Sequence, residues 1–191
     1  MTQEQLQEQY SQILQSAAAI QVTGSGMGET LSIPGGGSIS ASNLLNQVKT
    51  EMAPILVNHN IREIDTSPIS ETNAQGLASS HEPGKIHVDV SKLFNSARQM
   101  LSSTTQLDGM QADPDAFKSV VNNIIVYLTN WLHGELTETI GHESQHRKQF
   151  EEAVVNVHGP LNLNVPEAPA ESFGRQQRQR FVQPFQRSLS Y

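Results

Sequence analysis

Residues 142–146 read His-Glu-Ser-Gln-His, and no other run in the chain indicates a chemistry so directly. An α-helix turns by about 100° per residue, so His142 and His146 lie on one helix face, one turn apart. Two imidazoles in this arrangement can bind one Zn²⁺, while Glu143 can serve as a base toward water at the metal. The spacing predicts a hydrolytic zinc site. The alternative is a surface helix that carries two solvated histidines by coincidence.

The residues ahead of this run extend the pattern. Thr139 stands three positions before His142, and the residues between them, Ile140 and Gly141, are uncharged. With this lead-in the segment resembles the zincin metallopeptidases. The resemblance implies a zinc-dependent metalloendopeptidase that hydrolyses peptide bonds through a zinc-bound water activated by Glu143, with a peptide or protein as substrate. The chain departs from the family pattern at Arg147 and Lys148, where an uncharged and then an apolar residue are expected.

A catalytic zinc site needs a third protein ligand in addition to the two histidines. The long metzincin pattern is excluded, because Gln149 and Glu152 stand where it has glycine and histidine. Residues 166–174 are predicted to open a second helix, with Pro169 in its first turn.

Glu171 and Gly174 of that second helix resemble the Glu-x-x-small element of the gluzincins. The small size of Gly174 would let the second helix pack closely on the first. By this resemblance we expect Glu171 to be the third ligand, with Glu167 as the next candidate and His158 after it. The alternative for Glu171 is an ordinary acid near a helix N-terminus, where the helix dipole favours negative charge.

Two further residues have expected roles near the metal. Glu138 lies one turn before His142 on the same face and is expected to orient a ligand from outside the metal's own ligand set. Family members often use a tyrosine or histidine to stabilise the oxyanion, and His158 is the candidate for that donor here, ahead of Tyr127 and Tyr191.

Composition limits the other classes of function. The formal net charge of −7 disfavours a general nucleic-acid binder, which needs clustered cations. Because the chain has no cysteine, neither a thiolate zinc site nor a disulfide is expected. No apolar run reaches the roughly 18 residues of a membrane span, and the N-terminus lacks the order of a signal peptide, so we expect a soluble protein without a membrane partner. The sequence does not indicate a compartment.

Periodicity outlines the elements that would position the site. Helices are expected over residues 2–20, 42–53 and 114–152, the last with a break near residues 133–134. A strand is expected over residues 60–66 and a polar loop over 67–84. Residues 86–90 alternate between apolar and polar, as in a half-buried strand. Resemblance to zincins implies that Lys85 to Val90 form the edge strand that receives substrate. The alternative is an ordinary sheet strand.

These elements predict an α+β fold in which a small mixed sheet has its edge strand packed on the active-site helix, followed by a C-terminal helix that carries the glutamate ligand. Residues 1–41 are expected to form an N-terminal helix and a Gly-rich flexible segment, and residues 42–191 a zincin-like metallopeptidase domain. A second hypothesis is a non-catalytic zinc-binding or assembly protein that retains this fold, and it rests on Arg147, Lys148 and the Gln-rich N-terminus.

Overall fold

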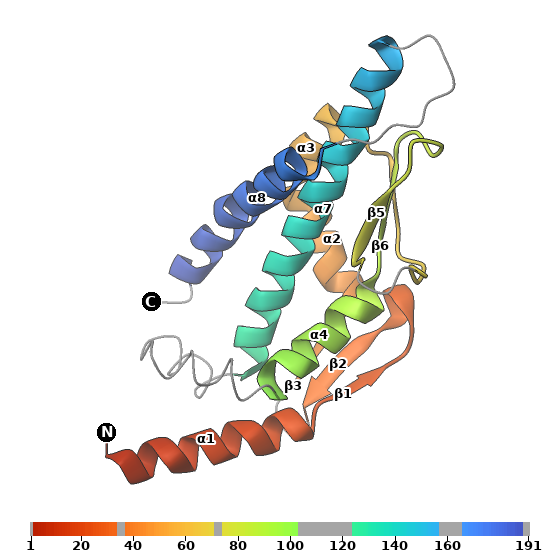
Figure 1. Cartoon of the computed structure of the whole chain (residues 1–191). Coiled ribbons are helices and arrows are strands. Elements are labelled where there is room, and N and C mark those ends of the chain that lie inside the picture. The colour runs from red at the N-terminus through yellow and green to blue at the C-terminus, as the bar shows by residue number, and fades with distance from the viewer. Residues whose placement is uncertain (1, 34–36, 71–73, 103–123, 157–165, 189–191) are drawn as a thin grey trace.

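The computed structural model describes residues 2–33, 37–70, 74–102, 124–156 and 166–188 (Figure 1). The helices are α1 (Gln3–Ala18), α2 (Ala41–Glu51), α3 (Ala53–Asn58), α4 (Val90–Ser102), α7 (Ile124–Asn156) and α8 (Glu167–Ser188), with a 3₁₀ turn η1 at Gly26–Gly28. The strands are β1 (Gln21–Thr23), β2 (Thr30–Ile33), β3 (Gly37–Ser40), β4 (Glu63–Asp65), β5 (Gly76–Ala78) and β6 (Lys85–Val88). The predicted α+β class is confirmed.

Two three-stranded sheets flank the helices. The first is antiparallel in the order β1-β2-β3, and the second has the order β4-β6-β5. In the second sheet, β6 pairs parallel with β4 and antiparallel with β5, so the sheet is mixed, as predicted. No helix in the described part of the chain has both the length and the apolar character needed to cross a membrane.

Helix α7 runs through the middle of the molecule. Helix α8 crosses one side of it, and the sheet of β5 and β6 lies on the other (Figure 1). One face of α7 carries an apolar residue every fourth position, each at most 3% exposed: Leu128, Leu132, Leu136 and Ile140. Burying each such side chain contributes roughly 1.5–3 kcal/mol. Beyond Ile140 the buried residues of α7 include the polar Glu143, Ser144, His146 and Arg147, and then Phe150.

The predicted break near residues 133–134 is wrong, because α7 is continuous there. Nε2 of the buried His133 lies 2.6 Å from Oε2 of Glu51 on α2, so this histidine holds helices together instead of joining the metal site. A Cβ at Gly134 would lie 2.9 Å from Nε of Arg178, so the glycine makes room for an arginine of α8. Residues 114–123 of the predicted helix lie outside the described residues.

The strand predicted at residues 86–90 is confirmed over residues 86–88 as part of β6, whereas Val90 begins α4. Its predicted place as the edge strand is wrong. β6 is the middle strand, and the edge next to α7 is β5, within the segment expected to be a polar loop. β5 has only three residues and no β-branched side chain, so its sequence gives no strand signal. Pairing with β6, in which Leu77 faces His87, makes it a strand.

The N-terminal region contains more structure than expected. The helix predicted over residues 2–20 is confirmed as α1. Residues 21–33 and 37–40 belong to the segment expected to be Gly-rich and flexible, and they contain β1, β2 and β3. Residues 34–36 of that segment lie outside the described residues. Leu31 and Ile39 are 0% and 5% exposed and belong to the same apolar core as α7. α2 begins at Ala41, one residue before the predicted C-terminal domain, and Oγ of Ser40 accepts the N–H of Asn43 to cap it.

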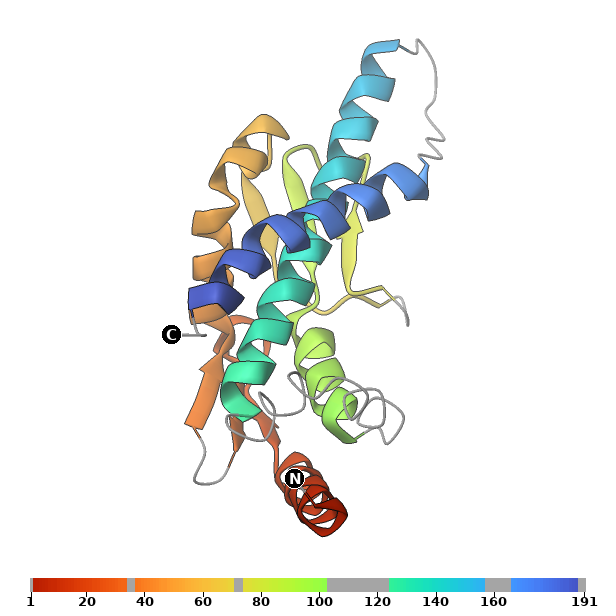
Figure 2. The same ribbon diagram turned by 90° about the vertical axis from the view of Figure 1, so that its left-hand side faces the viewer.

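The contact between α7 and α8 depends on two glycines. A Cβ on Gly174 would lie 2.6 Å from the backbone oxygen of Glu138 and 3.2 Å from Cβ of His142. A Cβ on Gly141 would lie 3.2 Å from Cα of Gly174. The backbones therefore touch where α8 crosses α7 (Figure 2), and the predicted close packing at Gly174 is confirmed.

The substitution Gly174→Ala tests this contact. The added methyl meets backbone, which cannot rotate away, so the substitution should lower the free energy of unfolding by about 1–3 kcal/mol. Gly28→Ala is the control, because a Cβ there meets nothing within 4 Å. Chemical denaturation should leave the control within about 0.5 kcal/mol of the wild type. Equal stability of both variants would contradict close packing at the crossing.

Candidate metal centre

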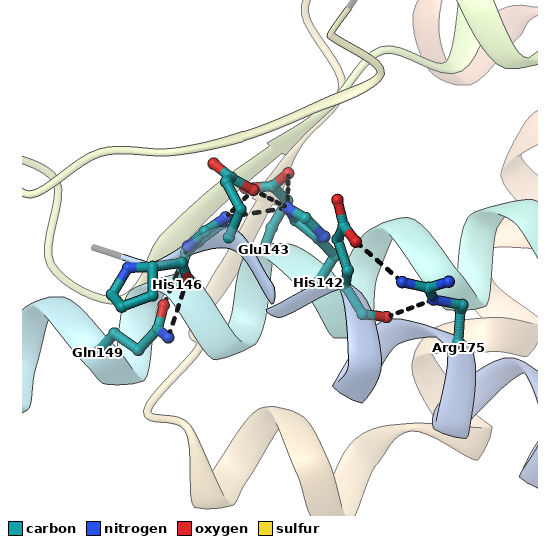
Figure 3. A network of polar contacts seen from close by, with 8 residues as sticks. His142, Glu143, His146, Gln149 and Arg175 are labelled. Carbon is teal, nitrogen blue, oxygen red and sulfur yellow. Dashed lines mark hydrogen bonds and ion pairs between the residues drawn. The ribbon is translucent and has the colours of Figure 1, made fainter. Parts of the chain in front are cut away.

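Three side chains from two helices meet at one point (Figure 3). Nε2 of His142 and Nε2 of His146, both on α7, are 2.9 Å apart. Oε2 of Glu167, in the first turn of α8, lies 3.3 Å from Nε2 of His142 and 3.2 Å from Nε2 of His146. These three atoms form a compact triangle of two imidazole nitrogens and one carboxylate oxygen. Within the described residues, this group could hold a metal ion.

The size of this triangle suits a single small cation. Zinc ligands lie at about 2.0–2.2 Å, so neighbouring ligand atoms of a tetrahedral site are roughly 3.4 Å apart. The three measured separations of 2.9, 3.2 and 3.3 Å are slightly shorter. Small outward movements of the three side chains would bring these atoms to the spacing of a zinc site.

The α8 crossing explains how Glu167 reaches the histidines. Gly174 sits against His142, and Glu167 lies two turns earlier on α8. The close backbone contact brings the start of α8 over the His142–His146 face. A carboxylate in a first turn is also favoured by the helix dipole. The Glu167 side chain is 70% exposed, so the site is open to solvent on this side.

Glu171, the expected third ligand, has a different contact. Its Oε2 lies 2.9 Å from Nη2 of Arg175, one turn further along α8. Its charge still acts on His142, as does that of Glu167. The carboxylate that the structure brings onto both histidines is thus Glu167, the second candidate from the sequence. The ligand role of Glu171 remains a prediction.

The other expected site residues are spread out. Oε2 of Glu138 accepts a hydrogen bond from Nη1 of Arg178 at 3.0 Å, so this carboxylate anchors α8. His158 and Tyr191 lie outside the described residues. The hydroxyl of Tyr127 contacts the sulfur of Met100. Nε2 of His87 lies 2.7 Å from Oε2 of Glu82, on the sheet face that carries Lys85.

Glu143 is held beneath the edge strand β5. Its side chain is 9% exposed, and its Oε1 lies 3.9 Å from Nε2 of His142. A Cβ at Gly76 would come within 2.7 Å of Cγ and Oε1 of Glu143 and of Cγ2 of Thr139. Only a glycine lets β5 lie so close to α7. The threonine of the sequence lead-in thus packs against β5, a role that the sequence did not reveal.

Arg147, which departs from the zincin pattern, is buried and not a surface cation. It is 2% exposed, and its Nη1 donates a hydrogen bond to the carbonyl of Ser79, directly after β5. Its Nη2 lies 3.8 Å from Oε1 of Glu151. Arg147 lies one turn after Glu143, so α7 contacts β5 at Gly76 and again just beyond its end. The neighbouring Lys148 is exposed and pairs with Glu152.

The electrostatics of the site favour neutral histidine. Burial lowers the pKa of His142, and a charge on His146 would lower this pKa further, while Glu167, Glu171 and Glu138 act in the opposite direction. A neutral imidazole is the form that binds a metal. The lowered pKa therefore reduces the competition from protons near neutral pH.

Comparison with models of known protein families, with curated protein sequences and with solved structures gives no match. The functional assignment therefore rests on the residues and geometry of this chain.

A matched pair of variants tests which of two glutamates of α8, Glu167 or Glu171, binds zinc. Removing the charge at Glu167 deletes a group that lies within 3.3 Å of both histidines, so Glu167→Gln should weaken zinc binding at least about tenfold. Glu171→Gln should weaken it less than about threefold, because this carboxylate pairs with Arg175. Competition with a chromogenic chelator measures both. The opposite order would make Glu171 the ligand, as the sequence predicts.

Proposed function

We propose that this protein is a zinc-dependent metalloendopeptidase. The observation that carries the proposal is the convergence of His142, His146 and Glu167 on one point, with the buried Glu143 beside them. Two imidazoles and one carboxylate form the ligand set of one class of catalytic zinc site, in which a fourth position stays open. The absence of cysteine from the chain fits the same chemistry.

The residues support hydrolysis as follows. Zinc, when bound, supplies the positive charge that acidifies a water molecule and polarises the scissile carbonyl. Glu143 accepts the proton of the attacking water on its carboxylate and donates it to the leaving amine. Its position between α7 and β5 restricts its rotamers and holds it beside the histidines. In this role Glu143 acts as a base and does not itself bind the metal.

The edge strand β5 is the proposed docking strand for the substrate. The carbonyl of Gln75 accepts the N–H of Asp89, and Leu77 pairs with His87, so both bond toward β6. Because bonding direction alternates along a strand, Gly76 and Ala78 turn their N–H and C=O groups to the free edge. A peptide added there would lie next to Glu143, which touches Gly76. This assigns to β5 the role that the resemblance implies for Lys85–Val90.

The substitution Glu143→Gln tests the enzyme proposal. The amide keeps the size of the side chain but cannot take a proton, so casein cleavage should fall at least about 100-fold while bound zinc, measured by elemental analysis, stays unchanged. Glu152→Gln is the control, since the side chain of this glutamate, on the same helix, is 63% exposed.

Two outcomes would contradict this proposal. A wild-type protein that binds zinc but cleaves no substrate in a broad panel would favour a non-catalytic zinc-binding or assembly protein. A wild-type protein that binds no zinc would remove both functions.

The docking strand has its own test in Ala78→Pro. Proline removes the outward N–H of Ala78 and is tolerated at such an edge position. Loss of one hydrogen bond should raise KM for extended peptides by about 2- to 12-fold. Ala78→Ser keeps the N–H and serves as control. Short substrates that end before β5, and zinc affinity, should not change. Equal KM values for the two variants with long peptides would mean that substrate does not bind along β5.

A further inference from the structure

Gln149 contacts both helices that supply the metal ligands. It lies three residues after His146 on α7, and its Oε1 is 3.1 Å from Nδ1 of that histidine. Its Nε2 donates a hydrogen bond to the carbonyl of Pro166 at 3.2 Å. Pro166 is the residue directly before α8 and Glu167. Figure 3 shows Gln149 beside His146 on the side away from His142.

These two bonds fix which atom of the amide faces which partner. The carbonyl of Pro166 can only accept a hydrogen bond, so the amide NH₂ must face it. The amide oxygen then faces His146, and it can only accept. This contact favours the neutral tautomer of His146 that carries its proton on Nδ1 and keeps the lone pair of Nε2 free. Oε2 of Glu167, 3.2 Å from Nε2, favours the other tautomer as long as no cation lies between the two atoms. Nε2 is the atom that points toward His142 and Glu167.

The same side chain also holds the start of α8. Its hydrogen bond to Pro166 joins two residues that are 17 positions apart in the chain, and it ties α7 to the residue directly before Glu167. One glutamine thus sets the tautomer of one ligand and the position of another. Ligand histidines in metal sites generally donate their second N–H to a neighbouring acceptor, which orients the ring and raises its basicity.

We propose that Gln149 is a positioning residue for the metal centre, which holds His146 in its metal-binding tautomer and holds Glu167 at the site. The inference rests on the proposed zinc site. It gives a role to Gln149, one of the two residues that exclude the metzincin pattern. It also replaces Glu138, which the sequence suggested as the orienting neighbour and which pairs with Arg178.

Zinc affinity, measured by chelator competition, is the first test. Gln149→Met has similar length but makes neither bond, and it should weaken zinc binding about 10- to 100-fold. Gln149→Glu keeps an acceptor for Nδ1 of His146 but loses the donor to Pro166, so it should recover part of the affinity. Lys148→Met is the matched control, because this neighbouring side chain is 45% exposed and pairs only with Glu152 among the described residues; its affinity should stay within about twofold of wild type.

The tautomer of His146 is the second test, and it is independent of metal and activity. Ring ¹⁵N chemical shifts of the zinc-free protein should show a larger share of the Nδ1–H tautomer of His146 in the wild type and in Gln149→Glu than in Gln149→Met. In Gln149→Met the proton should move toward Nε2, the tautomer that free imidazoles favour. A residue that only stabilised the fold would not give this pattern, and thermal unfolding of the zinc-free variants shows whether each is folded.

The outcomes separate this inference from the proposed function. Equal zinc affinity in wild type and Gln149→Met, or the same His146 tautomer in both proteins, would overturn the role of Gln149 and leave the zinc site standing. A wild-type protein that binds no zinc would overturn the site itself and the inference with it. Weaker binding in Lys148→Met by the same factor as in Gln149→Met would make the effect nonspecific and would also overturn the inference.

Discussion

The close approach of α7 and α8 at Gly141 and Gly174 is the constraint on which the site depends. The two histidines follow from local helix spacing, but a third ligand must come from another element. Only because two glycines let the backbones touch does the first turn of α8 reach His142 and His146. A larger residue at Gly174 would push against the carbonyl of Glu138 and lift Glu167 away. Arg178, which joins Glu135 and Glu138, holds the same crossing from its other side.

On the opposite side of α7, a glycine again allows a close contact, this time with a strand. Gly76 lets β5 lie against Glu143 and Thr139, and the buried Arg147 holds the chain just after β5 through the carbonyl of Ser79. Nη1 of the buried guanidinium makes this hydrogen bond, while Nε of Arg147 has no hydrogen-bond partner among the described residues. The two histidines proposed as metal ligands thus face α8, and the proposed base faces the sheet. The helix that carries both is fixed on its two sides by close contacts at glycine.

Sequence alone predicts the parts of this arrangement that depend on local spacing. The His-Glu-Ser-Gln-His run at residues 142–146, the amphipathic helices and the alternating strand β6 each have a spacing that can be read directly from the sequence. The choice of Glu167 over Glu171 cannot be read in this way, because it depends on where α8 begins and how it crosses α7. The edge strand β5 could not be predicted, because its three residues, Gly-Leu-Ala, form a strand only through their pairing with β6. Gly134 suggested a break in the helix. In the structure it leaves room for the side chain of Arg178, which lies 44 positions further along the chain.

Anomalous scattering from crystals of the zinc-loaded protein tests directly whether His142, His146 and Glu167 hold one zinc ion. We expect one strong peak within about 2.0–2.2 Å of Nε2 of His142, Nε2 of His146 and a carboxylate oxygen of Glu167. A peak held by Glu171 in place of Glu167 would preserve the metal site and refute the role given to the helix crossing. The absence of any peak at the two histidines would contradict the account as a whole.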